Sequence, residues 1–201
     1  MTEDDTCLFF GEYTARQKSS FSATNQFVLN FKKSVDRRGR AEWQYKERAI
    51  HQAGQAFAAA ITPQWLASAT LVPIPPSKAK TDPLYDDRIV RMLRSISAAA
   101  PLDIRELLIQ HQTRIAAHDA DVRPSPEEIA AGYDIDEVLC RSARSVIALF
   151  DDVITTGSHF VASSRVLKAR FPQADVYGFF IARRVPETTD FSEFFDNLDD
   201  E

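Results

Sequence analysis

The segment from residue 144 to residue 182 constrains the fold most, because it holds two apolar runs separated by a helical pattern. The first run, Arg144–Phe150 (RSVIALF), is almost continuously apolar, which is typical of a central parallel strand covered on both faces. A helix is expected over Ser158–Arg170 and a second buried strand over Ala174–Ala182. Parallel strands need a crossover, usually a helix, so this order predicts an α/β fold with a mainly parallel central sheet flanked by helices.

The middle of the chain adds elements of the same kind. Apolar residues at helical spacing predict helices over Tyr45–Ile61 and Asp86–Ser97, and a buried strand is expected over Ala69–Pro75. The motif Ser-Pro-Glu-Glu at Ser125–Glu128 is a capping box with proline at the first helical position, which predicts a helix start. The stretch DIRELLI is ambiguous between strand and helix, and YDIDEVL is expected to form an edge segment.

The N-terminal region carries weaker signals. Residues 7–40 are expected to be irregular, apart from a short strand at Gln26–Phe31, where the residues have high β-propensity. Three segments are therefore predicted: an N-terminal hood over 1–44, a core over 45–185, and a tail over 186–201. The tail spaces its apolar residues as on one face of a short amphipathic helix, namely Phe191, Phe194, Phe195 and Leu198.

Composition limits the classes of function. The 201 residues suffice for one buried core, and 44% hydrophobic with 26% charged residues is ordinary for a soluble globular domain. The apolar runs are far shorter than the roughly 20 residues of a membrane helix, and the acidic N-terminus is unlike a secretory signal. We expect a cytoplasmic protein whose Cys7 and Cys140 are reduced thiols. The net charge of −5 makes a nucleic-acid partner an unfavoured interpretation, and the basic run Lys32–Arg40 is expected to be solvated.

Two adjacent acids, Asp151 and Asp152, follow the first apolar run directly. The hydroxyl-bearing turn Thr155–Ser158, with Gly157 inside it, then opens the predicted helix. Ligands of open α/β sheets bind outside the carboxyl ends of the strands, and free N–H groups at a helix N-terminus suit a phosphate. Acceptors for vicinal hydroxyls thus stand close to donors for an anion, as a ribose 5-phosphate would require. A simple acid-capped turn would explain one aspartate but not two together with the hydroxyl run.

The stretch VIALF-DD-VI-TTGSH resembles the binding motif for phosphoribosyl diphosphate (PRPP) of type I phosphoribosyltransferases. That motif is an apolar strand, two acids, two aliphatic residues and a Thr-Thr-Gly-x-Thr loop. The resemblance implies that Asp151 and Asp152 are the catalytic acids, which bind the ribose hydroxyls and hold Mg²⁺ through water. It also implies a cradle for the 5′-phosphate made of Thr155, Thr156, Gly157, Ser158 and His159.

Two positions depart from this family pattern. His159 stands where the last threonine is usual, which would change the phosphate contact or mark a decayed site. Thr155 stands where purine-salvage members carry an aspartate, which speaks against a 6-oxopurine acceptor.

A second loop supports the same resemblance. The strand ATLVPIP followed by PSK looks like the diphosphate loop of that fold, with Ser77 and Lys78 as donors, although Lys78 is equally compatible with a solvated loop lysine. The order of motifs over roughly residues 45–183 is similar to the ComF-like branch, but the N-terminal zinc ribbon is missing and PLYDDR replaces a Gly-Phe-Asn-Gln stretch. A polar loop over 111–128 is the candidate lid, from which Arg114 and Arg123 could reach the diphosphate.

The function expected from this resemblance is Mg²⁺-dependent transfer of ribose 5-phosphate from PRPP to a nitrogen nucleophile, with release of pyrophosphate. A non-catalytic module that binds PRPP or a nucleotide is the alternative from another class. A partner-binding scaffold with a vestigial site is the weakest alternative, because the acid pair is intact. A homodimer is compatible with each of them.

Overall fold

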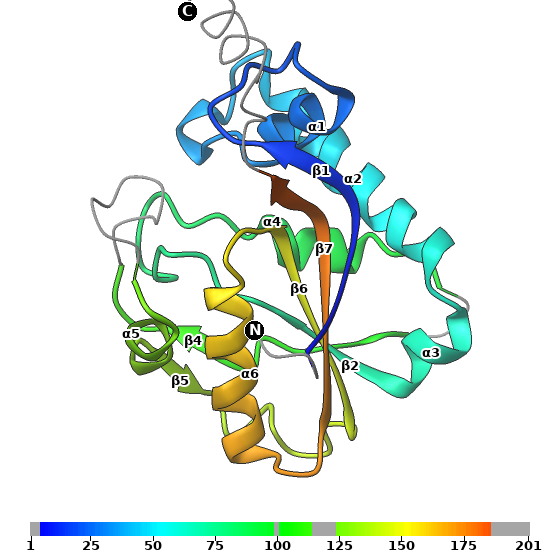
Figure 1. Cartoon of the computed structure of the whole chain (residues 1–201), viewed down its shortest axis with the longest axis vertical. Helices are drawn as coiled ribbons and strands as arrows, with labels where there is room; N and C mark the ends of the chain where they lie inside the picture. The colour runs from blue at the N-terminus through cyan, green and yellow to red at the C-terminus, as the bar shows by residue number, and fades with distance from the viewer. Residues whose placement is uncertain (1–4, 99–100, 114–123, 186–201) are drawn as a thin grey trace, which may run out of the picture.

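The structure is a computed structural model and describes residues 5–98, 101–113 and 124–185. Its centre is a five-stranded sheet in the order β1-β7-β6-β2-β3, in which every neighbouring pair is parallel (Figure 1). The strands are β1 (Thr6–Thr14), β2 (Ala69–Pro73), β3 (Asp103–Ile104), β6 (Val146–Ile154) and β7 (Asp175–Val185). A smaller antiparallel pair joins β4 (Leu108–Gln110) to β5 (Tyr133–Ile135). The predicted α/β architecture with a mainly parallel central sheet is therefore confirmed.

Helices cover both faces of the sheet. One face packs against α1 (Ala23–Phe31), α2 (Trp43–Ala60), α3 (Pro63–Ser68) and α4 (Arg88–Arg94), and the other packs against α6 (Ser158–Arg170) (Figure 1). Successive residues of β6 alternate between these layers: Phe150 belongs to the first core and Leu149 to the second. This two-sided burial explains why the strand is apolar without alternation.

The β6-α6-β7 unit has the predicted order, and the helices at α2 and α4 and the strand at β2 are also confirmed. The predicted capping box begins α5 (Pro126–Ala131). There Ser125 Oγ accepts from the N–H of Glu128 at 3.2 Å, and Glu128 Oε2 accepts from the N–H of Ser125 at 2.7 Å. The ambiguous stretch DIRELLI contributes to β3 and β4, and YDIDEVL contains β5.

The prediction that residues 7–40 are irregular is wrong, because Thr6–Thr14 forms β1 and pairs with β7 at every position except Phe10. The predicted strand at Gln26–Phe31 is also wrong, because these residues lie in α1. Ser22 caps this helix by accepting from the N–H of Asn25 at 3.0 Å, and Val28 and Phe31 are buried one turn apart. Burial on a helical face outweighs the β-propensity of valine and phenylalanine here.

The first 44 residues are thus divided between two places. β1 belongs to the central sheet, whereas α1 and the short 3₁₀ turn η1 (Val35–Arg37) lie over the carboxyl ends of β1 and β7 (Figure 1). The helix expected in the tail, 186–201, lies outside the described residues. Within the described ranges, no helix has the combination of length and apolar character that crossing a bilayer requires.

The aromatic side chain of Phe57 anchors the first core. Its ring lies 4.7 Å from that of Phe10, 5.1 Å from that of Phe150 and 6.5 Å from that of Phe179, measured between centroids. We predict that Phe57→Ala lowers the free energy of unfolding by about 3–5 kcal/mol, because it leaves a cavity among these rings. The exposed Phe21 provides the control, since Phe21→Ala should cost no more than about 0.5 kcal/mol. Denaturant midpoints at equal slope would measure both, and equal losses would contradict this account of the core.

Candidate functional site

Strand β6 continues through the two acids to Ile154 instead of ending at the apolar run. Because successive side chains of a strand point to opposite faces, Asp151 and Asp152 are directed apart. Asp152 is buried, whereas Asp151 is partly exposed. The acid pair is therefore two separate carboxylates in different surroundings, and the repulsion between them is reduced.

Asp152 is surrounded by cations. Its Oδ1 lies 3.2 Å from Lys32 Nζ, and its Oδ2 accepts from Arg88 Nη2 at 2.5 Å and from Arg88 Nε at 3.0 Å. Burial alone would raise the pKa of Asp152, but the charges of Lys32 and Arg88 outweigh it and hold that pKa well below its usual value. Both carboxylate oxygens are thus occupied by side chains of the protein itself.

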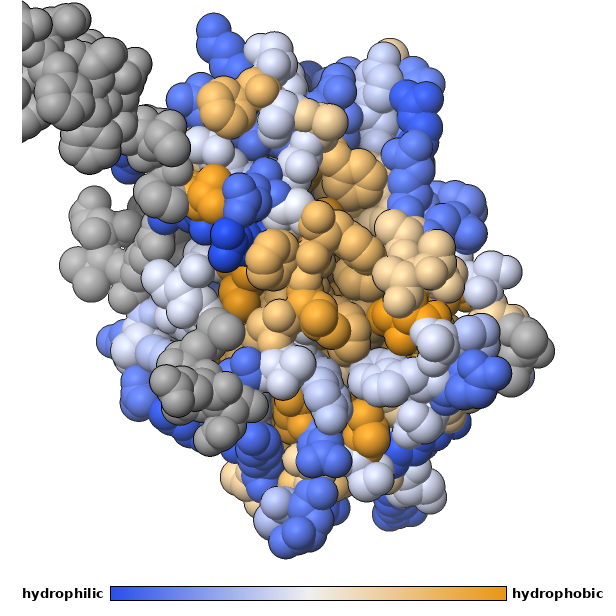
Figure 2. Space-filling model, turned by 45° about the vertical axis from the view of Figure 1, so that its right-hand side comes forward, coloured by the Kyte–Doolittle hydropathy of each residue, from blue (hydrophilic) through white to orange (hydrophobic). Residues whose placement is uncertain are grey.

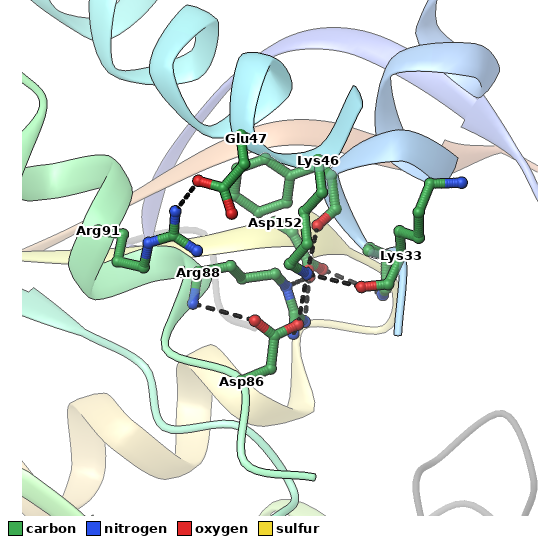
Figure 3. A network of polar contacts seen from close by, with 9 residues as sticks. Lys33, Lys46, Glu47, Asp86, Arg88, Arg91 and Asp152 are labelled. Carbon is green, nitrogen blue, oxygen red and sulfur yellow. Dashed lines mark hydrogen bonds and ion pairs between the residues drawn. The ribbon is translucent and has the colours of Figure 1, made fainter. Parts of the chain in front are cut away.

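Arg88 extends this contact into a larger cluster. Its Nη1 donates to Asp86 Oδ2 at 2.9 Å, and the same oxygen accepts from Lys46 Nζ at 2.7 Å (Figure 3). Lys46 is fully buried and also donates to the carbonyl oxygens of Phe31 and Lys33, at 3.0 and 2.8 Å. Burial lowers the pKa of Lys46, and Asp86 opposes this effect. We call the set Lys32, Lys46, Asp86, Arg88 and Asp152 the buried ion network, of which Lys32 is the outer member, with a side chain that is 40% exposed.

Asp151 faces a different environment. Its Oδ1 accepts from the N–H of Asp152 at 2.7 Å, and its side chain lines a pocket beside the carboxyl end of β2. Burial, with a smaller contribution from the charge of Asp152, raises the pKa of Asp151 above its usual value. Of the two acids, Asp151 is the one that a ligand in this pocket could reach.

The pocket lies between the end of β2 and the start of α4. Acids and bases both line it: the charged residues are Lys78, Lys80, Asp86, Asp87, Arg88, Glu106 and Asp151. The enclosed volume is about 30 Å³, which has room for about two water molecules. A sugar phosphate must therefore bind at the open side of the pocket, with Asp151 and the lysines at its edge.

Of the residues predicted to bind the diphosphate, only Lys78 is among the described residues that line the pocket. Lys78 lines the pocket, and its Nζ is 3.6 Å from Asp82 Oδ2. Ser77 is partly buried in the same loop but does not line the pocket. Arg114 and Arg123 of the candidate lid lie outside the described residues.

The predicted phosphate loop opens α6 as expected. Gly157 has φ +80°, a left-handed conformation that glycine adopts readily, and no described side chain caps the helix after it. The first N–H groups of α6 are thus available to an anion, and the helix dipole favours negative charge there. Thr155 and Thr156 are exposed, and Thr156 Oγ1 lies 2.9 Å from Ser158 Oγ.

His159, which departs from the family pattern, has a partner inside the protein. Its Nδ1 lies 3.2 Å from the hydroxyl oxygen of Tyr133 at the start of β5. A ring nitrogen bonded in this way fixes the orientation of the imidazole at the first turn of α6.

Sequence reasoning missed the cations of the network. Lys32 was expected to be solvated with the rest of the basic run, and Arg88 lies in the PLYDDR stretch that departs from the ComF-like pattern. The sequence pattern places Asp86 only as the first residue of a predicted helix. Two features of the sequence could have indicated these contacts, namely the basic run Lys32–Arg40 and the charged turn Asp86–Arg88. Both could supply counter-ions to the acid pair.

Whether this site could hold a magnesium ion depends on which of its side-chain oxygens are available as ligands. In the described part of the chain, no group of three or more His, Cys, Asp or Glu side chains could hold a metal ion. Mg²⁺ is usually held by one or two carboxylates, water and substrate phosphates, so a complete protein cage is not required. Asp151 fits this pattern. Asp152 does not fit as a direct ligand, because Lys32 and Arg88 occupy both of its oxygens.

Comparison with known proteins identified no relative of this chain. No protein-family model matches the chain, and no curated protein is significantly similar to it. The assignment of function therefore depends on the residues and contacts described above.

The buried ion network should be indispensable for folding. We predict that Lys46→Met lowers the free energy of unfolding by about 3–5 kcal/mol, because it removes one partner of a buried ion pair and leaves two carbonyl groups without their donor. Lys33→Met is the matched control, since the Lys33 side chain points away from the network (Figure 3). Chemical denaturation would measure both variants, and an equal cost for the two would show that the network does not stabilise the fold.

Proposed function

We propose that this chain is a phosphoribosyltransferase of type I, which transfers ribose 5-phosphate from PRPP to a nitrogen nucleophile in the cytoplasm. The observation that carries the proposal is the position of Asp151. It lines a pocket at the carboxyl end of the sheet, and the hydroxyls of Thr155, Thr156 and Ser158 and the uncapped start of α6 come directly after the end of the same strand at Ile154. A hydroxyl acceptor and an anion site thus lie in consecutive segments, as a ribose 5-phosphate needs.

Each part of the substrate has candidate contacts in this chain. Asp151 would accept hydrogen bonds from the ribose hydroxyls, and the loop from Thr155 to His159 would donate to the 5′-phosphate. Lys78 and Lys80 line the pocket beside them, and to bind the diphosphate they would have to exchange their present partners, Asp82 at 3.6 Å and Glu106 at 2.6 Å. A bound Mg²⁺ ion would neutralise charge on the diphosphate leaving group. Asp151 and oxygens of the substrate would hold that ion.

The reaction requires positioning and charge stabilisation from the protein. The C1′–O bond breaks, and pyrophosphate departs with the bonding electron pair. A new C1′–N bond then forms, and the nucleophile loses its proton. Catalysis of this kind depends on fixed dipoles and cations around the leaving group.

One observation favours a second candidate, a non-catalytic module that binds PRPP or a nucleotide and regulates a partner. Asp152 is neutralised by Lys32 and Arg88, so only one acid of the pair faces the pocket. A binding module would need no second carboxylate. Ligand-dependent stabilisation without pyrophosphate release in the presence of candidate amines and bases would select this candidate.

Thermal unfolding with Mg²⁺ and PRPP tests the site directly. A ligand at 100 times its Kd adds about 2.7 kcal/mol, which for a chain of this size raises Tm by roughly 5–10 °C. We predict that Asp151→Asn removes most of this shift, because the neutral amide has a single acceptor oxygen and binds hydroxyls and Mg²⁺ more weakly than the carboxylate does. Asp175→Asn, an exposed change at the start of β7, should retain the shift. A wild-type protein that PRPP does not stabilise would leave the vestigial scaffold as the remaining interpretation.

A further inference from the structure

The pocket beside the carboxyl end of β2 is lined by charged side chains of both signs. It differs in this from the face of the molecule drawn in Figure 2, whose centre is apolar and is surrounded by hydrophilic residues. Acids are unexpected in a site for PRPP, a substrate whose phosphate groups are negatively charged. Two acids of the lining, Asp87 and Glu106, belong neither to the buried ion network nor to the proposed ribose contact. Of these two, Glu106 is paired with a lysine of the pocket.

Glu106 lies between β3 and β4, and its partner Lys80 lies in the loop that follows β2. Glu106 Oε2 is 2.6 Å from Lys80 Nζ, and the two side chains are 25% and 53% exposed. In the described part of the chain, the Glu106 carboxylate has no other ion pair or hydrogen bond. Pairs of this exposure contribute little to folding because water screens them and both side chains lose conformational freedom. The contact between Glu106 and Lys80 is therefore easily broken.

Tyr85 supports the position of the Glu106 carboxylate in the pocket. Both residues line it. Burial raises the pKa of Tyr85 to about 12, and the charge of Glu106 is the largest contribution from the neighbouring acids. Charges act over short distances in salt solution, so the carboxylate lies near the Tyr85 hydroxyl. Glu106 is thus an anionic group inside a site that is proposed to bind an anion.

The other lysine of the pocket, Lys78, has a partner of a different kind. Its Nζ is 3.6 Å from Asp82 Oδ2, an oxygen that also accepts from Thr113 Oγ1 at 2.7 Å. Asp82 Oδ1 accepts from the N–H of Leu84 at 2.8 Å. Asp82 therefore holds its own loop together and keeps hydrogen bonds when Lys78 moves away. Glu106 has no such second role among the described contacts.

The backbone next to Lys80 is fixed, so that a change of partner needs only the side chain. Ala79 is buried, and its N–H donates to Thr113 Oγ1 at 3.2 Å. Its C=O accepts from the N–H of Asp82 at 2.9 Å. The half-exposed Lys80 side chain, with its long flexible stem, can turn from one oxygen to another without moving this loop.

We propose that Glu106 is an internal competitor of the substrate's diphosphate, which binds Lys80 in the free protein, yields it to the bound diphosphate and takes it back as pyrophosphate leaves. This inference rests on the proposed function, which makes pyrophosphate a product. The exchange gives Lys80 an anionic partner in both states. Its consequence is a lower affinity for pyrophosphate and a faster release, because affinity differences between related complexes lie mostly in the dissociation rate. Product release limits the turnover of many enzymes.

Calorimetric titration with inorganic pyrophosphate at fixed ionic strength tests the competition. Glu106→Gln keeps the size of the side chain and removes its charge, so it should lower the dissociation constant of pyrophosphate about three- to tenfold. Glu137→Gln is the matched control. It removes the same charge from an exposed pair with Arg170 outside the pocket and should change the dissociation constant by less than about twofold.

A double-mutant cycle separates competition for Lys80 from general repulsion of the anion. Lys80→Met should weaken pyrophosphate binding, and adding Glu106→Gln to it should then change the dissociation constant by less than about twofold. An equal gain in both backgrounds would mean that Glu106 only repels the anion, and it would overturn the proposal. Glu106→Asp provides a second variant. It keeps the charge but withdraws it from Lys80, so its affinity for pyrophosphate should lie between those of the wild type and Glu106→Gln.

The proposal also fails if Glu106→Gln and Glu137→Gln have the same effect, or if neither the wild type nor Glu106→Gln binds pyrophosphate. These results are distinct from the failure of the proposed function. Stabilisation by PRPP together with an unchanged pyrophosphate affinity of Glu106→Gln would overturn the competition alone. The expected pyrophosphate results without any stabilisation by PRPP would contradict the phosphoribosyltransferase activity and leave the exchange of Lys80 between two anions in place.

Discussion

The buried ion network determines how the parts of this molecule meet. Lys32 follows α1, Lys46 lies in α2, Arg88 begins α4, and Asp152 belongs to β6. Lys46, Arg88 and Asp152 would be too costly to bury as isolated charges, and they are tolerated because each one has an opposite partner, whereas Lys32 stays 40% exposed. The network therefore fixes α1 over the carboxyl ends of the strands and holds the first turn of α4 against β6.

The same network gives the two acids different roles. Asp152 belongs to the interior and neutralises two cations, which leaves Asp151 as the member of the pair that lines the pocket. A sequence motif treats the pair as one unit, but the alternation of a β-strand separates the side chains. In the proposed site, Asp152 thus acts on the ligand indirectly, by keeping Arg88 and Lys32 in place.

The sequence was informative where local signals agree with the fold. The apolar run of β6, the capping box at Ser125 and the helical spacing in α2 each depend on neighbours within a few residues. The failures are contacts between distant segments. β1 has no alternation that would reveal it, because it is exposed on both faces and pairs with a strand at the other end of the described chain. The contact between Lys32 and Asp152, 120 residues apart, leaves no trace in either segment alone.

The pairing of β1 with β7 has a consequence for how the protein is made. Glu12 of β1 and its partner Arg183 of β7 are 171 residues apart, so the first strand to leave the ribosome cannot enter the sheet until almost all the others have been synthesised. Contacts of such high sequence separation form late and slowly. During that interval β1 has no strand to pair with in the nascent chain, although Phe57, against which Phe10 packs, is already present. β1 thus has exposed apolar residues and also the longest delay between its synthesis and its pairing in the sheet. Chaperones that bind β1 during translation would protect it from aggregation over that delay.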